Sequence, residues 1–205
     1  ALDKKENRIG GAGNVALKLK NLGASPVIAS GVGTDSEGAI LEDLFQKRGI
    51  SSEGLVRSEY RKTTVKTRVI SSKQQLLRID SEDTHPLTSE HEQMLFEKIM
   101  HLIEIGIDAI ILEDYDKGVL NENNIQRIIS EAKKQNIPVT ADPKKDNFHH
   151  YAGLSLFKPN LKELKEGLNI DFSFEIRQVF SNEMYRWIEG YNKTCLLYTS
   201  PSPRD

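Results

Sequence analysis

Residues 142–163 read DPKKDNFHHYAGLSLFKPNLKE, and the rest of the chain is organised around them. An apolar run at 137–141 leads into Asp142, and a second run at 154–157 ends at Lys158. Each run has the length and apolar content of a short buried strand. Ligands bind beyond the carboxyl ends of the strands in an open parallel sheet, so polar residues at these two points predict a binding site.

The polar residues of this stretch carry both signs of charge, as a site for phosphate and a divalent cation requires. They are Asp142, Lys144, Lys145, Lys158, Asn160 and Glu163. The spacing of Asn160 and Glu163 leaves two interpretations open. Asn160 caps the following helix, and Glu163 either bonds back to that cap as a capping box or offers an oxygen ligand to Mg²⁺. The pattern alone favours the cap, whereas its place beside a second polar strand end favours the metal.

The motif DPKKDNFxxYxGxxxFKPNLKE resembles the heptose 7-phosphate kinases of the ribokinase (PfkB) family, which act in lipopolysaccharide inner-core synthesis. The resemblance covers roughly residues 8–168. It implies ATP-dependent phosphorylation of D-glycero-D-manno-heptose 7-phosphate to the 1,7-bisphosphate, with Mg²⁺ as cofactor. It also implies that Lys144 binds the sugar. The implied nucleotide-binding residues are Lys158, Asn160 and Glu163, and the implied metal ligands are Asp142, Asn160 and Glu163.

A glycine-rich segment, GGAGNVA at 10–16, opens a helix near the start of the chain. It fits the loose dinucleotide-binding pattern GxGxxA, but that pattern needs a buried strand before it, and residues 3–8 are charged. The segment instead resembles the family's GGxxxNxA sequence, which implies that Gly10, Gly11 and Asn14 contact the sugar acceptor. Tight helix packing is the alternative explanation for the glycines, but it does not account for Asn14.

Residues 63–70 and 75–80 are rich in β-forming residues and predict a hairpin inserted into an α/β chain. One face of its first strand carries cations, which by itself indicates a solvated surface. The resemblance implies instead a lid at about 53–81 that closes over an anionic sugar. A homodimer that pairs two such lids would also cover their strand edges. The lid residues implied to bind the substrate are Lys66, Arg68, Gln75 and Arg78.

A buried strand at 108–112 ends in the sequence EDYDKG. Asp114, Tyr115 and Lys117 match the family's D-Y-x-K-G segment, which implies that Asp114 and Lys117 bind the acceptor or a phosphate. Capping of the loop by its own side chains is an equally good explanation of the same residues.

Strand–helix units at 26–48, 108–135 and 137–167 predict an α/β fold. We expect an incomplete ribokinase-like domain, with a mostly parallel sheet flanked by helices and a small inserted β-lid. The predicted inward residues are Ile40, Leu41, Leu44 and Phe45 in the first long helix, Met94, Leu95, Ile99, Leu102 and Ile103 in the next, and Ile125, Ile128, Ile129 and Ala132 in the third. Further helical patches occur at 172–190.

Both ends of the chain look interrupted. The chain opens with ALDKKEN, without an initiator Met, and it closes with CLLYTSPSPRD, which reads like a translated sequencing adapter. We expect a partial sugar-kinase domain at 1–194 and an artefactual tail at 195–205, rather than a natural Ser/Pro-rich tail. The family's GAGD segment, whose Asp is the catalytic base, is not in the sequence. No catalytic residue is therefore assigned, and we expect the 205 residues alone to be inactive.

Composition narrows the choice of partners. The net charge is −2, with 28% charged residues and one cysteine. This balance gives no reason to expect a nucleic-acid or membrane partner, and we expect a cytoplasmic protein that binds ATP and a phosphorylated sugar. Two alternatives stay open: another PfkB carbohydrate kinase of the fructokinase or ribokinase type, and a non-catalytic remnant that binds sugar or dimerises.

Overall fold

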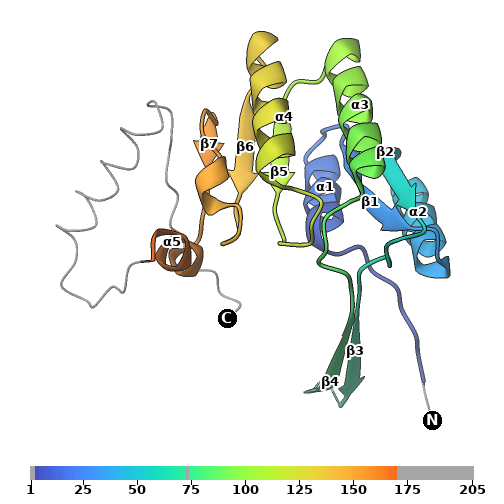
Figure 1. Cartoon of the computed structure of the whole chain (residues 1–205). Helices are drawn as coiled ribbons and strands as arrows, with labels where there is room; N and C mark the ends of the chain where they lie inside the picture. The colour runs from blue at the N-terminus through green and yellow to red at the C-terminus, as the bar shows by residue number, and fades with distance from the viewer. Residues whose placement is uncertain (1–2, 73, 170–205) are drawn as a thin grey trace. The chain divides into compact units, whose positions relative to one another are not determined.

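The computed structural model describes residues 3–72 and 74–169, which form two compact units (Figure 1). The first unit comprises Ala1–Ile99 with Lys117–Val119, and the second comprises Met100–Asp116 with Leu120–Asp205. The predicted helical patches at 172–190 and the predicted tail at 195–205 lie outside the described residues. No helix within 3–72 and 74–169 is long and apolar enough to cross a membrane.

The first unit begins with two helices and two parallel strands. These are α1 (Gly11–Asn21), β1 (Val27–Gly33), α2 (Ser36–Lys47) and β2 (Ser51–Ser58). Strands β1 and β2 pair in parallel, and both helices contribute to one apolar core with them. The buried residues of this core are Ala16, Val32, Phe45, Ile50 and Leu55.

Asp35 couples the start of α2 to the segment that enters the hairpin. Its side chain caps the helix by accepting from Gly38 N at 2.8 Å. It also accepts from Thr63 N at 2.8 Å and from Thr63 Oγ1 at 2.6 Å. Burial acts to raise the pKa of Asp35, but these hydrogen bonds outweigh it and lower the pKa below its ordinary value.

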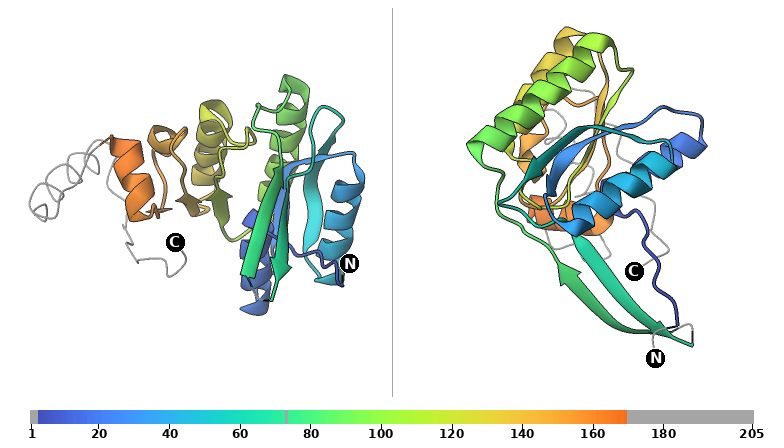
Figure 2. Two further views of the ribbon diagram at one scale, coloured as in Figure 1. Left: turned by 90° about the horizontal axis from the view of Figure 1, so that it is seen from below. Right: turned by 90° about the vertical axis from the view of Figure 1, so that its right-hand side faces the viewer.

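The predicted hairpin is confirmed as β3 (Val65–Ser71) paired antiparallel with β4 (Gln74–Ser81). It projects away from the β1–β2 layer of the first unit (Figures 1 and 2). The predicted start of the lid at residue 53 is wrong, because 53–58 belong to β2. Gly54, Leu55 and Val56 are buried there, and their strand pairs with β1 rather than with the hairpin.

Helix α3 (Ser89–Ile105) leads from the first unit into the second. The second unit contains β5 (Ile110–Glu113), α4 (Glu122–Lys134), β6 (Val139–Asp142), a short 3₁₀ helix η1 (Phe148–His150), β7 (Leu156–Phe157) and α5 (Leu161–Leu168). The three strands that are described in this unit are all parallel, in the order β5–β6–β7. Parallel pairing is thus confirmed in both units.

The predicted inward face is fully confirmed only for α4. Ile125, Ile128, Ile129 and Ala132 are at most 4% exposed. The predictions for Ile40 and Met94 are wrong, since these residues are 38% and 41% exposed. Both lie at the edge of their helix's apolar stripe, where periodicity fixes a direction but not the width of the face that a neighbour covers. Leu41, Leu44 and Ile99 are half-buried, whereas Phe45, Leu95, Leu102 and Ile103 are buried as predicted.

Candidate active site

In the second unit, two carboxylates end neighbouring strands at the same level. Glu113 of β5 and Asp142 of β6 are register partners, so their side chains point to the same face of the sheet. Burial raises the pKa of Glu113, and the nearby charge of Asp142 raises it further. Burial also raises the pKa of Asp142. This edge therefore concentrates negative charge that is only partly hydrated.

Two lysines offset this negative charge. Lys158 Nζ lies 3.5 Å from Asp142 Oδ1, and Lys144 Nζ forms an ion pair with Glu163 Oε1. Burial acts to lower the pKa of Lys144, but the hydrogen bond and charge of Glu163 raise it overall. The predicted residues Asp142, Lys144, Lys158 and Glu163 are thus brought together at the carboxyl edge of the sheet.

The Asn160–Glu163 pair forms a capping box, so the cap interpretation of this pattern is confirmed. Asn160 Oδ1 accepts from Glu163 N at 2.9 Å, and Glu163 Oε2 accepts from Asn160 N at 2.8 Å. With Lys144 on Oε1, both oxygens of Glu163 have partners. Glu163 is only 5% exposed, which makes this a largely buried arrangement.

The predicted metal ligands are Asp142, Asn160 and Glu163, and each has a partner within the protein. The capping box takes the Asn160 oxygen, while Lys158 and Lys144 pair with the two carboxylates. Among the described residues, no group of three or more His, Cys, Asp and Glu side chains is placed to hold a metal ion. The donor set does fit Mg²⁺ that keeps most of its water, because Mg²⁺ is usually held by one or two carboxylates together with substrate phosphates. Asp142 and Glu163 are the side chains that would hold it.

Asp114, predicted to contact substrate, instead anchors its own loop. It is 4% exposed and accepts from Tyr151 Oη at 2.7 Å, from Asn147 Nδ2 at 2.9 Å and from Asp116 N at 2.9 Å. Both carboxylate oxygens of Asp114 therefore have hydrogen-bond partners within the protein. These hydrogen bonds agree with the alternative explanation, in which Asp114 caps its own loop.

Asp116 is a strained neighbour of that anchor. Its φ is +50°, and its buried Oδ1 has no hydrogen-bond partner. Burial, followed by the charges of Asp114 and Asp146, raises the pKa of Asp116 to about 6. Burial likewise raises the pKa of Tyr115 to about 12, with a further contribution from Glu113.

In the first unit, the glycine-rich segment forms an exposed helix N-terminus. Gly10 is the N-cap of α1 without a side-chain cap, and Gly11 has φ +53°. Asn14 is exposed, and its backbone N–H donates to Gly10 O at 3.2 Å. Helix packing explains Gly13, where an added Cβ would lie 2.9 Å from the ring of Phe45. Gly10, Gly11 and Asn14 are all exposed, and their contact with an acceptor stays a prediction.

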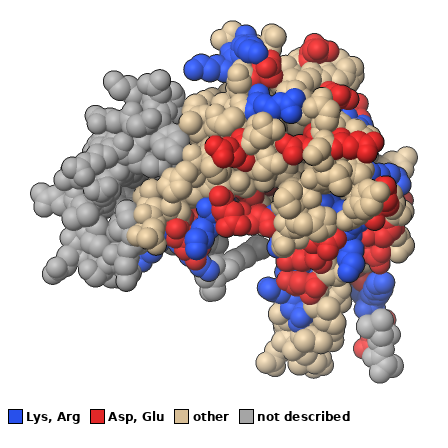
Figure 3. Space-filling model, in the orientation of Figure 1, with Lys and Arg blue, Asp and Glu red and all other residues tan. Residues whose placement is uncertain are grey.

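The cationic face of the hairpin is less basic than predicted, because its lysine and arginine are paired within the same unit. Lys66 Nζ lies 2.9 Å from Asp80 and 3.1 Å from Glu82, and Arg78 Nε lies 3.1 Å from Asp80. Lys117 Nζ lies 2.6 Å from Glu82. Figure 3 shows both signs of charge gathered around the base of the hairpin. Arg68, opposite Arg78, and Gln75, opposite Ile70, are exposed.

Arg61 connects two segments at the base of the hairpin through main-chain carbonyls rather than through a carboxylate. It is 7% exposed and donates to Lys117 O at 2.8 Å and to His85 O at 2.6 Å. Burial lowers the pKa of its guanidinium. Arg61 also borders an open hollow of about 350 Å³, which is lined further by Thr34, Asp35, Glu59, Tyr60, Lys62 and Asp83.

Comparison with known proteins identifies the family of this chain. The family model described as pfkB family carbohydrate kinase matches residues 2–179. The chain belongs to the pfkB family. Among curated pfkB relatives, it is 38% identical to the bifunctional protein HldE of Pelobacter propionicus over 167 residues, and 38% identical to that of Geobacter sulfurreducens over 196 residues. These alignments cover 82% and 96% of this chain, but only 34% and 39% of the relatives.

Solved structures agree on the pfkB fold. Phosphofructokinase-2 of Escherichia coli in complex with fructose-6-phosphate is 19% identical, with a TM-score of 0.71, and the match covers 94% of this chain and 62% of that one. A 2-dehydro-3-deoxygluconokinase of Thermotoga maritima is 14% identical, with a TM-score of 0.63 over 89% of this chain and 60% of that one. At these identities the likeness shows the ribokinase-like α/β fold alone.

The sequence analysis did not identify four residues that are important in the structure, which are Glu113, Glu82, Arg61 and Asp116. Glu113 could have been found, since it ends its strand as Asp142 ends the next. Glu82 and Arg61 gave no signal, because their partners lie far away in sequence or on the main chain. Asp116 occupies the variable position of the D-Y-x-K-G segment, but its positive φ is visible only in the structure.

Proposed function

We propose that these residues belong to an ATP- and Mg²⁺-dependent cytoplasmic kinase that phosphorylates D-glycero-D-manno-heptose 7-phosphate to the 1,7-bisphosphate in lipopolysaccharide inner-core synthesis. The observation that carries the proposal is the convergence of both signs of charge at one sheet edge. Glu113, Asp142 and Glu163 meet Lys144 and Lys158 there. Phosphoryl transfer depends on positioning and electrostatic stabilisation, and such an edge supplies both.

Each member of this edge has a proposed task. Lys144 binds the sugar acceptor and Lys158 binds phosphate oxygens of the nucleotide, and each exchanges its present carboxylate partner for its ligand. Asp142 and Glu163 would hold a hydrated Mg²⁺, which would supply charge neutralisation at the transferred phosphoryl group. The capping box fixes Glu163 by its backbone bond to Asn160, so the carboxylate keeps its place when Lys144 moves.

Two features of the hairpin are evidence for an anionic acceptor and for an oligomer. Lys66, Arg68 and Arg78 carry positive charge on it, and Lys117 lies at its base. The other face of the hairpin exposes Val69, Leu77 and Ile79 to 41%, 52% and 53%. Two such faces would bury each other in a homodimer, which would also cover the open strand edges.

The experiment is a comparison of sugars as acceptors. We define the full-frame protein as the product of the complete natural reading frame that contains residues 1–194. Its ATP-dependent rate is measured with heptose 7-phosphate, fructose 6-phosphate, fructose and ribose. We expect kcat/KM for heptose 7-phosphate to exceed that for the neutral sugars by about 100-fold or more, because a site built for a charged group rejects a substrate that lacks it.

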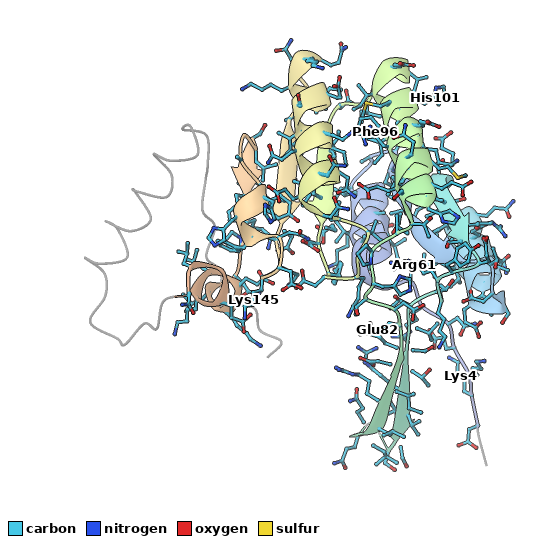
Figure 4. The ribbon with its side chains drawn as sticks, viewed as in Figure 1. Lys4, Arg61, Glu82, Phe96, His101 and Lys145 are labelled. Atoms are coloured by element: carbon cyan, nitrogen blue, oxygen red, sulfur yellow. The ribbon has the colours of Figure 1, made fainter. Side chains whose placement is uncertain are left out.

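A matched lysine pair tests the site itself. Lys144→Met should lower kcat/KM about 100-fold, since it removes a charge from the phosphate path. Lys145→Met removes the neighbouring charge, for which the structure assigns no role, and should change kcat/KM less than about threefold (Figure 4). Equal effects of the two substitutions would contradict the assigned role of Lys144.

A second candidate is a pfkB kinase for a neutral sugar, such as a fructokinase or ribokinase. The observation in its favour is the pairing of Lys66 and Arg78 with Asp80 and Glu82, which reduces the positive charge offered to an acceptor. Faster turnover of fructose or ribose than of either sugar phosphate would establish this candidate and overturn the first.

A further inference from the structure

The carboxylate of Glu82 lies between two lysines of the first unit. Its Oε1 accepts from Lys117 Nζ at 2.6 Å, and its Oε2 accepts from Lys66 Nζ at 3.1 Å. The Glu82 side chain is 20% exposed, against 38% for Lys66 and 26% for Lys117. Each oxygen therefore takes a different ammonium group in a partly buried setting. Two ammonium groups that converge on one anion in this way form an anion-binding position.

The main chain on both sides of this position is held in place. Arg61 donates to the carbonyls of His85 and Lys117, and Leu87 N donates to Gly118 O at 3.0 Å. Gly118 has φ +70°, and a Cβ added there would lie 2.1 Å from His85 O. The segments that carry Lys117 and Glu82 are thus packed backbone to backbone, and they present these two side chains to one another without help from a ligand.

We propose that Glu82 determines acceptor specificity by occupying the anion position between Lys66 and Lys117 until a phosphate dianion displaces it. The proposal rests on the proposed function, in which these lysines face the acceptor. A phosphate dianion has more charge and more acceptor oxygens than a carboxylate, so it exchanges for Glu82. A neutral hydroxyl brings no charge and leaves the lysines with Glu82. The internal carboxylate thereby excludes unphosphorylated sugars.

Asp80 completes the arrangement. It lies 2.9 Å from Lys66 and 3.1 Å from Arg78, on the strand opposite Lys66. When Glu82 leaves, Asp80 keeps the Lys66 ammonium at the position where phosphate arrives. Asp80 is therefore a positioning residue, whereas Glu82 is the competitor.

The test uses the 205-residue chain and inorganic phosphate at pH 8, where phosphate is mostly a dianion. Binding is followed through the Nζ signals of the lysines in an NMR titration. Glu82→Gln should tighten phosphate binding about tenfold, because a neutral amide competes more weakly than a carboxylate for the lysines. Glu53→Gln makes the same charge change on β2, where the carboxylate hydrogen-bonds Ser51, and should leave the dissociation constant unchanged within about twofold.

A second pair of variants keeps the proposal open to refutation. Lys117→Met combined with Glu82→Gln should abolish the gain, and a gain that persists would place phosphate elsewhere and overturn the proposal. Unchanged or weaker binding in a Glu82→Gln chain with wild-type circular dichroism would also overturn it. If that chain does not fold, Glu82→Asp serves instead, since the shorter side chain cannot span both lysines and should tighten binding by a smaller factor.

This experiment involves neither ATP nor turnover. A negative kinase assay would therefore remove the proposed function and leave the exchange of Glu82 for phosphate standing. Conversely, a heptose 7-phosphate kinase in which Glu82→Gln binds phosphate no more tightly would retain its function and lose this inference.

Discussion

Tyr151 donates a 2.7 Å hydrogen bond to Asp114, and both residues are buried, at 3% and 4% exposure. The bond joins the turn after η1 to the loop after β5, 37 positions earlier in the chain. Burial, followed by the charge of Asp114, raises the pKa of Tyr151. The hydroxyl therefore remains a donor across the physiological range.

Removal of this donor should be measurable but not fatal. Tyr151→Phe leaves Asn147 on the same oxygen of Asp114, and we expect unfolding free energy to fall by about 1–2 kcal/mol. Asp114→Ala strands two buried donors and should cost about 3 kcal/mol. Urea unfolding measures both, with Tyr60→Phe as the control, since Tyr60 is 63% exposed. Equal stabilities of the Tyr151 and Tyr60 variants would refute the anchor.

Asp116 should make stability depend on pH. Its pKa is raised from 3.8 to about 6, so the folded chain takes up the proton more readily than the unfolded chain. The stabilisation that comes from the protonated form is complete below about pH 4 and is lost as pH rises through about 6. Above that, the wild type carries a buried charge.

Asp116→Asn should therefore stabilise the chain at pH 8 by about 1 kcal/mol, after discounting for partial solvent screening, and have no effect at pH 4. Asn also tolerates the positive φ at this position. Thermal unfolding at the two pH values is the measurement, with the exposed Asp108→Asn as control. A gain of the same size at both pH values would show that charge is not the cause.

Gly118 should be intolerant of any side chain for two separable reasons. Its φ of +70° costs an L-residue about 1–2 kcal/mol, and the added Cβ would also meet the His85 carbonyl at 2.1 Å. Gly106 shares a positive φ of +95° but has open space around it. We expect Gly106→Ala to lower unfolding free energy by about 1 kcal/mol and Gly118→Ala by about 3 kcal/mol or more. Similar losses in chemical denaturation would mean that the close approach has relaxed.

Glu163 can be tested as a cap and as a charge in one substitution. Glu163→Gln keeps an oxygen for Asn160 N but removes the charge beside Lys144, so stability should fall by less than about 1 kcal/mol. In the full-frame protein, the same change should lower kcat about 10-fold or more at saturating Mg²⁺. Asn121→Ala, which breaks the capping box of α4, shows what a lost cap alone costs. Full activity in Glu163→Gln would leave the residue with a purely structural role.

The sequence was most informative where a pattern is local. The apolar face of α4, the hairpin and the polar strand ends at Asp142 and Lys158 follow from periodicity and composition, and all are present. The capping box at Asn160 and Glu163 was also visible as a spacing of three. Its competition with the metal interpretation could not be resolved from sequence, because the outcome depends on Lys144, which reaches Glu163 from 19 positions away.

Pairings between distant segments could not be predicted. The predicted lid included residues 53–58, and only their burial and their pairing with β1 place them outside the hairpin. The resemblance implies that the hairpin cations face a ligand, and nothing in the sequence marks Asp80 and Glu82 as their partners. The contact between Phe148 and Gly167 could not be predicted either. The ring of Phe148 is fully buried and leaves no room for a Cβ at Gly167, but nothing in the motif indicates this contact.

The base of the hairpin is attached in two chemically different ways. The lysines are held by carboxylates, and such exposed ion pairs weaken as ionic strength rises. Arg61 is buried and donates hydrogen bonds to main-chain carbonyls. A hydrogen bond to an uncharged acceptor is far less sensitive to screening by salt. Molar salt should therefore release Lys66 and Lys117 from Glu82, while the hydrogen bonds of Arg61 to the main chain at the base of the hairpin remain. Crystals grown from concentrated salt and from polyethylene glycol would then differ in these side chains and agree in the backbone beneath them.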